Sequence, residues 1–300
     1  MHGQQRPYPG TVTSASNPGT LEAVLQTLAG RTMTVLTGAG ISTDSGIPDY
    51  RGPLSPPRTP MTYQQFVGDP DFRRHYWARN HVGWRHVHRQ SPNGGHRALV
   101  ALEAAGVVNG VITQNVDRLH TLAGSRCVVD LHGTYARVLC LACGHPVTRA
   151  ELAVRLEAMN PEFAAVHAVG DAEIAPDADA VLATTEGFRV ADCDRCGGML
   201  KPDIVYFGEN VPKPRVAEAY ALVDAADALL VVGSSLTVMS GLRFVRHVVR
   251  NNSARANVPV VILNRGWTRG DELATVKLDA GCTETLTALA ATLGPARASA

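Results

Sequence analysis

The chain has 300 residues, of which 45% are hydrophobic, and a formal net charge of +1 at pH 7. This length and apolar content predict one large domain with a smaller attachment. The charge argues against nucleic-acid binding as the main function, although it leaves room for a local basic patch, and no apolar run reaches the about 18 residues of a membrane span. Residues 1–20 are polar and lack the apolar core of a secretory signal, so we expect a disordered tail and a cytoplasmic protein.

A glycine-rich loop follows the first predicted strand. Leu21–Leu28 predicts a helix and Thr32–Leu36 a strand, and three glycines come next, Gly38, Gly40 and Gly46. This order is typical of the opening unit of a dinucleotide-binding domain, in which Gly38 makes a tight turn and Gly40 lets the backbone approach a pyrophosphate at a helix start. Thr43 replaces the third glycine of the G-x-G-x-x-G fingerprint, and no acidic residue follows at the end of the next strand. The loop alone therefore leaves nucleotide binding and a structural turn equally open.

A proline-rich loop and a helical module come next. Gly52–Pro60 contains too many prolines for a helix and predicts a lid beside the nucleotide. Thr62–Phe66 and Pro70–His81 predict helices. Their aromatic residues, Phe66, Phe72, Tyr76 and Trp77, have roughly helical spacing, which favours a packed core over ligand stacking.

Polar residues follow two further predicted strands. After a helix at His96–Ala105, the strand Val107–Thr113 delivers Gln114, Asn115 and Asp117 to the sheet edge where ligands bind in open parallel sheets. Asn115 and Asp117 could equally cap a helix starting near Arg118. The strand Val128–Leu131 ends at His132 and Gly133, and a histidine there could face a cleft and exchange protons near neutral pH, although a lone histidine is more often structural.

Four cysteines form two CxxC-Gly knuckles, Cys140 with Cys143 and Cys193 with Cys196. This pattern is typical of a tetrahedral structural zinc site whose four thiolates leave no position for catalysis. Disulfides are the competing interpretation, but a chain without a secretion signal keeps its thiols reduced. The gap between the knuckles exceeds the about 15–20 residues of a compact zinc ribbon, so it contains an insertion, with a helix at Glu151–Met159 and a surface loop at His167–Phe188.

The second half alternates helices and strands. Strands are predicted at Asp203–Phe207, Ala228–Val232 and Pro259–Leu263, and helices at Pro214–Asp224 and Gly241–Arg250. The fold class is therefore α/β, a doubly wound, Rossmann-like parallel sheet with a smaller lobe made of the helical module and a four-cysteine zinc ribbon. We divide the chain into a sheet domain (residues 21–52, 91–136 and 199–300), the helical module (53–90) and a zinc-binding module (137–198).

The run GAGISTDSGIPDYRG resembles the first signature of the sirtuins, the NAD-dependent protein deacylases. TQNVD, LHG, the two CxxC pairs, KPDIVYFGE and GSSLT follow in the family's order, between about Leu21 and Leu289. RHYWARN, QNVDRLHTLAGS and RVLCLACG resemble the class II branch, which includes sirtuin 4, and a comparable insertion marks that branch.

The resemblance implies a function and a set of site residues. It implies that an acyl-lysine protein or peptide and NAD react to give free lysine, nicotinamide and O-acyl-ADP-ribose, with one structural zinc ion in the protein. His132 would be the catalytic base, Asn115 and Asp117 would organise ribose and nicotinamide, and Tyr50 and Arg51 would close the site. The implied cofactor contacts are Gly38, Ala39, Gly40, Ile41, Thr43, Asp49, Tyr50, Arg51, Gln114, Asn115, Val116, Asp117, Gly233, Ser234, Ser235, Asn264, Arg265, Gly266 and Cys282. Substrate peptide would add as a strand to Val205, Tyr206, Phe207, Gly208 and Glu209.

The loop after the first signature bears on acyl specificity. Sirtuins that prefer succinyl- or malonyl-lysine carry Tyr-x-x-Arg shortly after the first signature, whereas Gly52–Met61 has only Arg58 as a cation. This difference favours acetyl or longer neutral acyl groups. A branched acidic acyl group stays open as the alternative, if the loop folds inward and Arg58 reaches it. The main alternative activity is mono-ADP-ribosylation of protein. A non-catalytic NAD or ADP-ribose sensor is the next alternative. The broken fingerprint and the zinc ribbon argue against a nicotinamide dehydrogenase. No nucleic-acid or membrane partner is expected, and a monomer is assumed.

Overall fold

The computed structural model describes residues 19–50, 60–161, 163, 180, 182, 184–251 and 257–294. Several predictions lie outside these residues: nearly all of the tail at 1–20, Arg51, the loop Gly52–Pro60 except Pro60, and most of His167–Phe188. Within the described ranges, no helix has both the length and the apolar character needed to cross a membrane.

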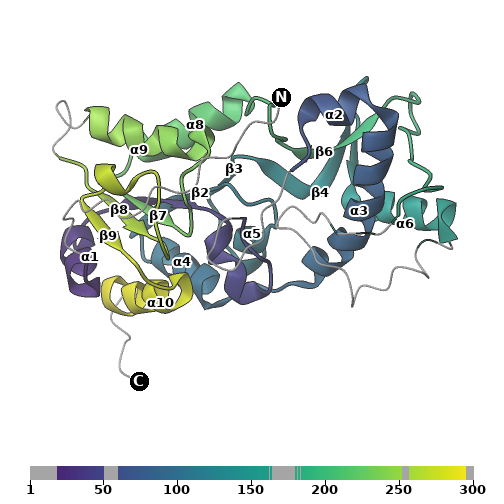
Figure 1. The fold of residues 1–300 in the computed structure, drawn as a ribbon. Helices are drawn as coiled ribbons and strands as arrows, with labels where there is room; N and C mark the ends of the chain where they lie inside the picture. Colours follow the sequence, from purple (N-terminus) through teal and green to yellow (C-terminus); the bar gives the residue numbers. More distant parts are fainter. Residues whose placement is uncertain are drawn as a thin grey trace, which may run out of the picture.

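A six-stranded parallel sheet forms the centre of the larger lobe (Figure 1). Its strands are β1 (Met33–Thr37), β2 (Val108–Thr113), β3 (Val128–Asp130), β7 (Ala228–Val232), β8 (Val260–Leu263) and β9 (Val276–Leu278). The order across the sheet is β3-β2-β1-β7-β8-β9, and every neighbouring pair is parallel. The chain therefore winds outward from β1 in both directions, which confirms the predicted doubly wound fold.

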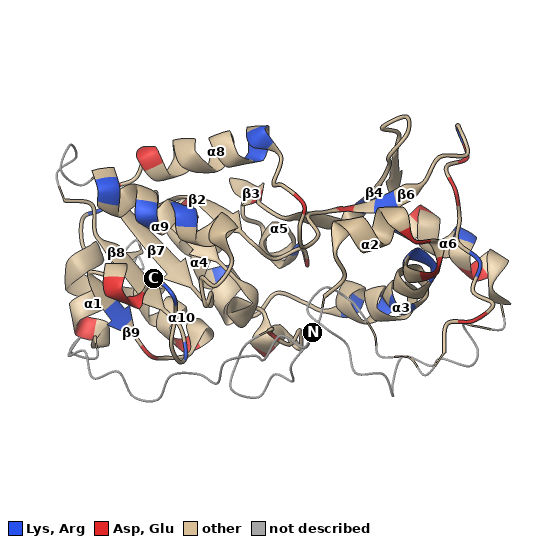
Figure 2. Cartoon of the chain, turned by 45° about the horizontal axis from the view of Figure 1, so that its top comes forward, with Lys and Arg blue, Asp and Glu red and all other residues tan. Residues whose placement is uncertain are grey.

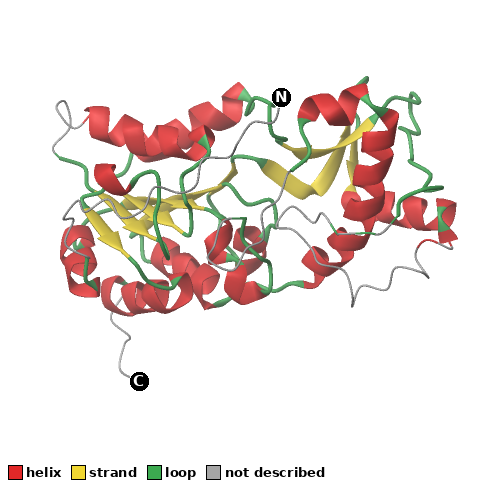
Figure 3. Cartoon of the chain, in the orientation of Figure 1, coloured by secondary structure: helices red, strands yellow, loops and turns green. Residues whose placement is uncertain are grey.

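Helices cover both faces of this sheet (Figure 3). One face packs against α1 (Leu21–Leu28), α4 (Gly94–Ala104) and α10 (Cys282–Leu293), and the other against α8 (Lys213–Asp224) and α9 (Met239–Asn251). Side chains alternate between the two cores because successive residues of a strand point to opposite faces: Val35 belongs to the first core and Leu36 to the second. Both faces are buried, which is why β7 reads as a continuous apolar run.

The smaller lobe contains a three-stranded antiparallel sheet in the order β5-β4-β6. Its strands are β4 (Gly133–Cys140), β5 (Pro146–Thr148) and β6 (Leu200–Ile204), and its helices are α2 (Tyr63–Gly68), α3 (Pro70–Arg89) and α6 (Arg149–Met159). Phe66, Tyr76 and Trp77 are at most 3% exposed and contact one another edge to face, as predicted for core aromatics. Phe72 differs, because its side chain is 43% exposed.

Some local predictions were wrong. The strand predicted at Asp203–Phe207 lies at Leu200–Ile204 and belongs to the small antiparallel sheet, where it pairs with β4. The α-helix expected after the glycine loop is replaced by two 3-10 turns, η1 (Ala39–Ile41) and η2 (Thr43–Ser45), and α3 runs eight residues past His81. Two further elements, η3 (Asp271–Leu273) and α5 (Leu119–Ala123), are each shorter than two helical turns.

Candidate active site and metal centre

The site forms at the carboxyl edge of the large sheet. Strands β1, β2 and β7 end there at Thr37, Thr113 and Val232, in adjacent positions. The glycine loop, Gln114–Asp117 and the Gly233–Thr237 turn leave these ends and are therefore neighbours in space. Parallel strands bring their carboxyl ends to one edge, so residues about 80 and 120 positions apart in sequence meet.

Close contact between two loops explains the glycines. A Cβ on Gly38 would lie 2.8 Å from the carbonyl oxygen of Gly233, and one on Gly40 would lie 2.9 Å from its Cα. Gly233 itself has φ +61°, and a Cβ there would meet the Ile41 nitrogen at 2.5 Å. Gly38 is extended, so the requirement for glycine there comes from packing against Gly233 and not from the tight turn that we predicted.

Asn115 and Asp117 point into the glycine loop and join it to the end of β2. Asn115 Nδ2 donates to the Gly38 carbonyl at 3.0 Å and to Ser42 Oγ at 3.1 Å. Ser42 Oγ donates to Asp117 Oδ2 at 2.7 Å, and Asp117 Oδ1 accepts from the Leu119 N–H at 2.9 Å. Burial raises the pKa of the Asp117 carboxyl, while these two hydrogen bonds oppose the rise. Asp117 thus makes the helix-capping contact that was its structural alternative, with the Leu119 N–H, and it also bonds to Ser42 in the glycine loop.

His132 is held in one orientation at the start of the small lobe. Its Nδ1 lies 2.9 Å from the Gln114 carbonyl oxygen, which can only accept, so Nδ1 carries the proton. Nε2 is then the acceptor, and the Ser240 hydroxyl donates to it at 2.7 Å. Burial lowers the pKa of His132 to about 4; the hydrogen bond to Gln114 opposes this shift, and the Arg215 and Arg243 charges add to it. At neutral pH the ring is therefore a neutral base with its lone pair on Nε2.

Gln114 connects this histidine to the Gly233–Thr237 turn. Its side-chain Nε2 donates to Ser234 Oγ at 2.8 Å, while its main-chain carbonyl holds His132. Gly241, at the start of α9, leaves room for the Gln114 side chain, because a Cβ there would approach Oε1 to 2.7 Å. The predicted residues Gln114, Asn115, Asp117, His132 and Ser234 are thereby brought together.

A buried histidine pair lies behind the glycine loop. His120 and His96 have ring centroids 4.8 Å apart, and His120 Nε2 lies 2.9 Å from Thr37 Oγ1. Burial lowers the pKa of His120 to about 3 and that of His96 to about 4. Both rings are therefore neutral and structural at pH 7.

The residues expected on the adenine side cluster at the ends of β8 and β9. A Cβ on Gly281 would lie 2.7 Å from Arg265 Nη2, so Arg265 crosses the start of α10. Cys282 is 8% exposed, and burial raises the pKa of its thiol to about 12, which excludes it as a thiolate nucleophile near neutral pH. Gly266 has φ +75°, and its N–H donates to Asp279. Asn264 and Ser235 are half-buried at the same edge.

The segment Val205–Glu209 leaves β6 and passes beside His132. The Val205 N–H donates to the His132 carbonyl at 2.8 Å, and the Phe207 carbonyl accepts from the Tyr63 N–H at 2.9 Å. Behind it, Lys201 Nζ is buried 3.0 Å from Glu209 Oε2 and 4.9 Å from the Tyr206 ring centroid. This ion pair anchors the far end of the segment. Tyr206 is buried, whereas Phe207 and Gly208 are exposed.

The remaining predicted contacts surround the loop. Ile41 is buried beneath it, Ala39, Asp49, Tyr50 and Val116 are half-buried, and Thr43 is exposed with its hydroxyl donating to the Gly40 carbonyl at 3.0 Å. Arg51 lies outside the described residues.

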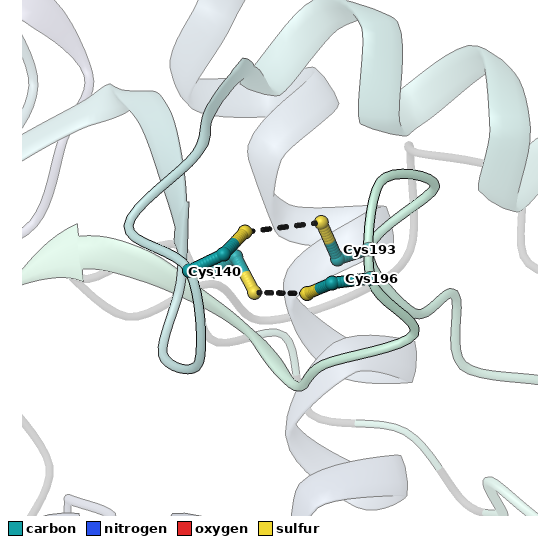
Figure 4. A group of neighbouring side chains, drawn as sticks. Cys140, Cys193 and Cys196 are labelled. Carbon is teal, nitrogen blue, oxygen red and sulfur yellow. Dashed lines mark hydrogen bonds between the residues drawn. The ribbon is translucent and has the colours of Figure 1, made fainter.

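The four knuckle cysteines converge at one end of the small sheet (Figure 4). Their Sγ atoms lie within 4.8 Å of one another, with Cys140 to Cys196 at 3.5 Å and Cys143 to Cys193 at 3.9 Å. Four sulfurs around zinc at about 2.3 Å would be about 3.8 Å apart, so the donor set fits a tetrahedral zinc ion. No disulfide forms among these described cysteines. Gly144 and Gly197 each follow a knuckle with φ +70°, which closes the turn.

Comparison with known proteins identifies the family. A model of the Sir2 family matches residues 38–240, which is more than half of the chain. The chain belongs to the Sir2 family. NAD-dependent protein deacetylase 1 of Mycobacterium avium is 64% identical over 95% of this chain and 98% of its own length. A protein of the same name from Streptomyces coelicolor is 52% identical over 92% of both chains.

Solved Sir2 structures have the same fold. One, of Sir2 with a p53 peptide and NAD+, covers 90% of this chain and 97% of its own at 30% identity and a TM-score of 0.67. Another, of Sir2 bound to acetylated peptide, covers the same shares at 29% identity and a TM-score of 0.64. The sirtuin resemblance of the sequence is therefore confirmed at the level of the family.

Sequence reasoning missed two polar residues of this site. The Ser42 hydroxyl forms hydrogen bonds with both Asn115 and Asp117, and the Ser240 hydroxyl forms one with His132. Ser42 lies inside the glycine motif and could have been selected from its position. Ser240 follows β7 by eight residues, in the first turn of α9, and only the folded chain shows that it reaches His132.

Proposed function

We propose that this protein is an NAD-dependent protein-lysine deacetylase. The observation that carries the proposal is His132, a neutral histidine with a fixed tautomer, placed beside the Gln114–Asp117 segment and the glycine loop. A general base must be unprotonated at working pH, and His132 meets this condition; a ribose hydroxyl would displace the Ser240 hydroxyl from its Nε2 lone pair. The names of the relatives and the peptide and NAD+ in the solved Sir2 structures support the same activity.

We infer the following roles for the chain's own residues. The glycine loop and Ser234 would hold the NAD phosphates, while Asn264, Arg265 and Gly266 would contact the adenine-side ribose. Asn115 and Asp117 would position the nicotinamide end. NAD supplies the electrophilic ribose carbon, and His132 Nε2 would take a proton from a ribose hydroxyl. Zinc on the four cysteines would hold the small lobe together and take no part in the chemistry.

The substrate would be an acetyl-lysine in a protein or peptide. Val205–Glu209 supports this proposal because its first residues follow β6 and both of its ends are fixed, by His132 and by the Lys201–Glu209 pair, with a turn at Gly208. A substrate strand paired with its main chain would be bound with little regard to sequence. Activity on longer neutral acyl groups and membership of the class II branch are further parts of the proposal, supported by the Gly52–Met61 sequence and by RHYWARN.

The test is an assay of nicotinamide release with and without an acetyl-lysine peptide. Release that requires the peptide, with loss of its acetyl group, is the expected result. His132→Ala should lower turnover by roughly 10²–10⁴-fold while NAD binding survives, as for loss of a general base. Release accompanied by label on protein would identify a mono-ADP-ribosyltransferase instead, and no release would identify a sensor.

A further inference from the structure

A basic groove runs along α9 beside the neighbouring helix α8. It encloses a cavity of about 200 Å³, lined by Tyr220 from α8 and by Arg243, Arg246, His247 and Arg250 from α9. Figure 2 shows the positive charges spaced along α9. We call this surface the α9 groove.

The arginines of the α9 groove have no acidic partner among the residues that the structure describes. Arg246 Nη1 contacts only Met239 Sδ, at 3.9 Å, and across the described ranges no carboxylate pairs with Arg243, Arg246 or Arg250. Other arginines do pair with carboxylates: Arg215 lies 2.8 Å from Asp203, and Arg85 lies 2.9 Å from Glu157. On the neighbouring helix, Asp224 Oδ1 lies 2.7 Å from His247 Nε2. The groove therefore has free donors for an external anion.

The groove begins at the candidate active site. Helices α8 and α9 run parallel, since Tyr220 contacts Phe244 and His247 while Asp224, one turn later, also meets His247. Their first turns lie beside His132: Ser240 bonds to it, and the charges of Arg215 and Arg243 act on it. The later turns, with Arg246 and Arg250, lead away from the site.

We propose that the α9 groove binds an acidic segment of the acyl-lysine protein, adjacent in the chain to the modified lysine. Guanidinium groups bind carboxylates through paired N–H donors, which matches the free arginines. Met239 to Arg250 spans about 16 Å at 1.5 Å per helical residue, and an extended chain covers that distance in about five residues. The acidic residues should therefore lie within about six positions of the lysine, on one side only. This inference rests on the proposed deacetylase function.

A short acidic peptide segment fits the groove better than a nucleic acid does. The basic stripe is limited to three arginines and one histidine on one helix, in a chain with a net charge of only +1. Asp224 on α8 already occupies the histidine, through its contact with His247. A polyanion needs a longer basic surface for its many phosphates.

The experiment compares three acetyl-lysine peptides of equal length. One is neutral, one carries three aspartates before the lysine, and one carries them after it. We expect one acidic peptide to exceed the neutral peptide in kcat/KM by about tenfold at low salt, mainly through KM, and to lose most of that advantage at 0.5 M salt, because three exposed charge pairs of ordinary strength are screened there. The double variant R246Q/R250Q should lose the preference while keeping its activity on the neutral peptide.

The matched control is R31Q/R126Q, which removes the same charge from a different surface and should keep the preference. Equal kcat/KM for all three peptides, or a preference that survives in R246Q/R250Q, would overturn the inference while leaving the deacetylase activity established. Absence of acetyl-dependent nicotinamide release from every peptide would overturn the proposed function itself. A single-stranded oligonucleotide that binds wild type and not R246Q/R250Q, with no peptide preference, would assign the groove to nucleic acid.

Discussion

Removing the Ser240 hydroxyl should lower the pKa of His132. In the neutral ring Nε2 accepts the Ser240 proton at 2.7 Å, and in the protonated ring the same hydroxyl can rotate and accept from the Nε2–H. The second bond is charge-assisted and therefore stronger, so the hydroxyl stabilises the protonated ring more than the neutral ring. Ser240 is 8% exposed, so water replaces the lost hydroxyl poorly. The variant Ser240→Ala tests this contact without adding volume to the packed start of α9.

The size of the effect follows from the difference between a charge-assisted and a neutral hydrogen bond. Net values of about 1.5–3 and about 0.5–1.5 kcal/mol differ by about 1 kcal/mol, which corresponds to about 0.7 pKa units at about 1.36 kcal/mol per unit. Burial is the larger influence on the pKa of His132, about 4, and Ser240→Ala leaves that influence in place. The pKa in the variant should therefore fall further below the ordinary value of 6.5.

The assay is the pH dependence of kcat/KM on an acetyl-lysine peptide, whose acid limb reports the free enzyme's base. Wild type should keep full kcat/KM well below pH 6.5, and the acid limb of Ser240→Ala should move to lower pH by about 0.7 unit. Ser125→Ala is the matched control, because Ser125 has the same 8% exposure and its hydroxyl has no hydrogen-bond partner among the described residues. An acid limb that stays in place, or moves to higher pH, would refute the contact assigned to Ser240.

Three further predictions concern stability and specificity. Cys193→Ser should lose zinc and lower the melting temperature and the activity together, since metal binding in such sites is part of the folding free energy; a zinc-free variant with unchanged melting and turnover would contradict this. Burial holds the pKa of His120 near 3, below its ordinary 6.5, so the stability contributed by the neutral ring is complete above pH 6.5 and is lost as the pH falls. Urea unfolding at pH 5 should therefore give a free energy of unfolding about 2 kcal/mol lower than at pH 7 on account of this residue. A free energy of unfolding that stays constant from pH 7 to 5 would contradict the prediction. Acetyl peptide should exceed succinyl peptide about tenfold in kcat/KM, because Gly52–Met61 lacks the Tyr-x-x-Arg pair that holds an acidic acyl group; a tenfold succinyl preference would point to Arg58.

Much of the architecture was readable from local sequence. Leu21–Leu28 and Ala228–Val232 have their predicted bounds, because helical periodicity and a fully apolar run depend only on neighbouring residues. The cysteine spacing likewise predicted the cluster, since each CxxC-Gly knuckle is a local turn.

The wrong predictions concern segments whose structure depends on contacts between residues far apart in the sequence. Lys201 and Asp203 interrupt the apolar pattern of β6, so its register and its partner β4 depend on contacts across the small lobe, including the Asp203–Arg137 ion pair. The glycine loop enters 3-10 turns and not an α-helix because Gly38 and Gly40 must pack on Gly233.

The sequence by itself determined the residue types of the site and, through its motifs, the family. The tertiary structure alone decided how they act. Nothing near His132 in the chain specifies its tautomer, which comes from the Gln114 carbonyl and from Ser240, 108 positions away. Its lowered pKa comes from burial between the two lobes, and the α9 groove exists because parallel packing of α8 and α9 brings Tyr220 against an arginine-lined face. Proton affinity and charge complementarity depend on distance and solvent access, and only the folded chain sets those quantities.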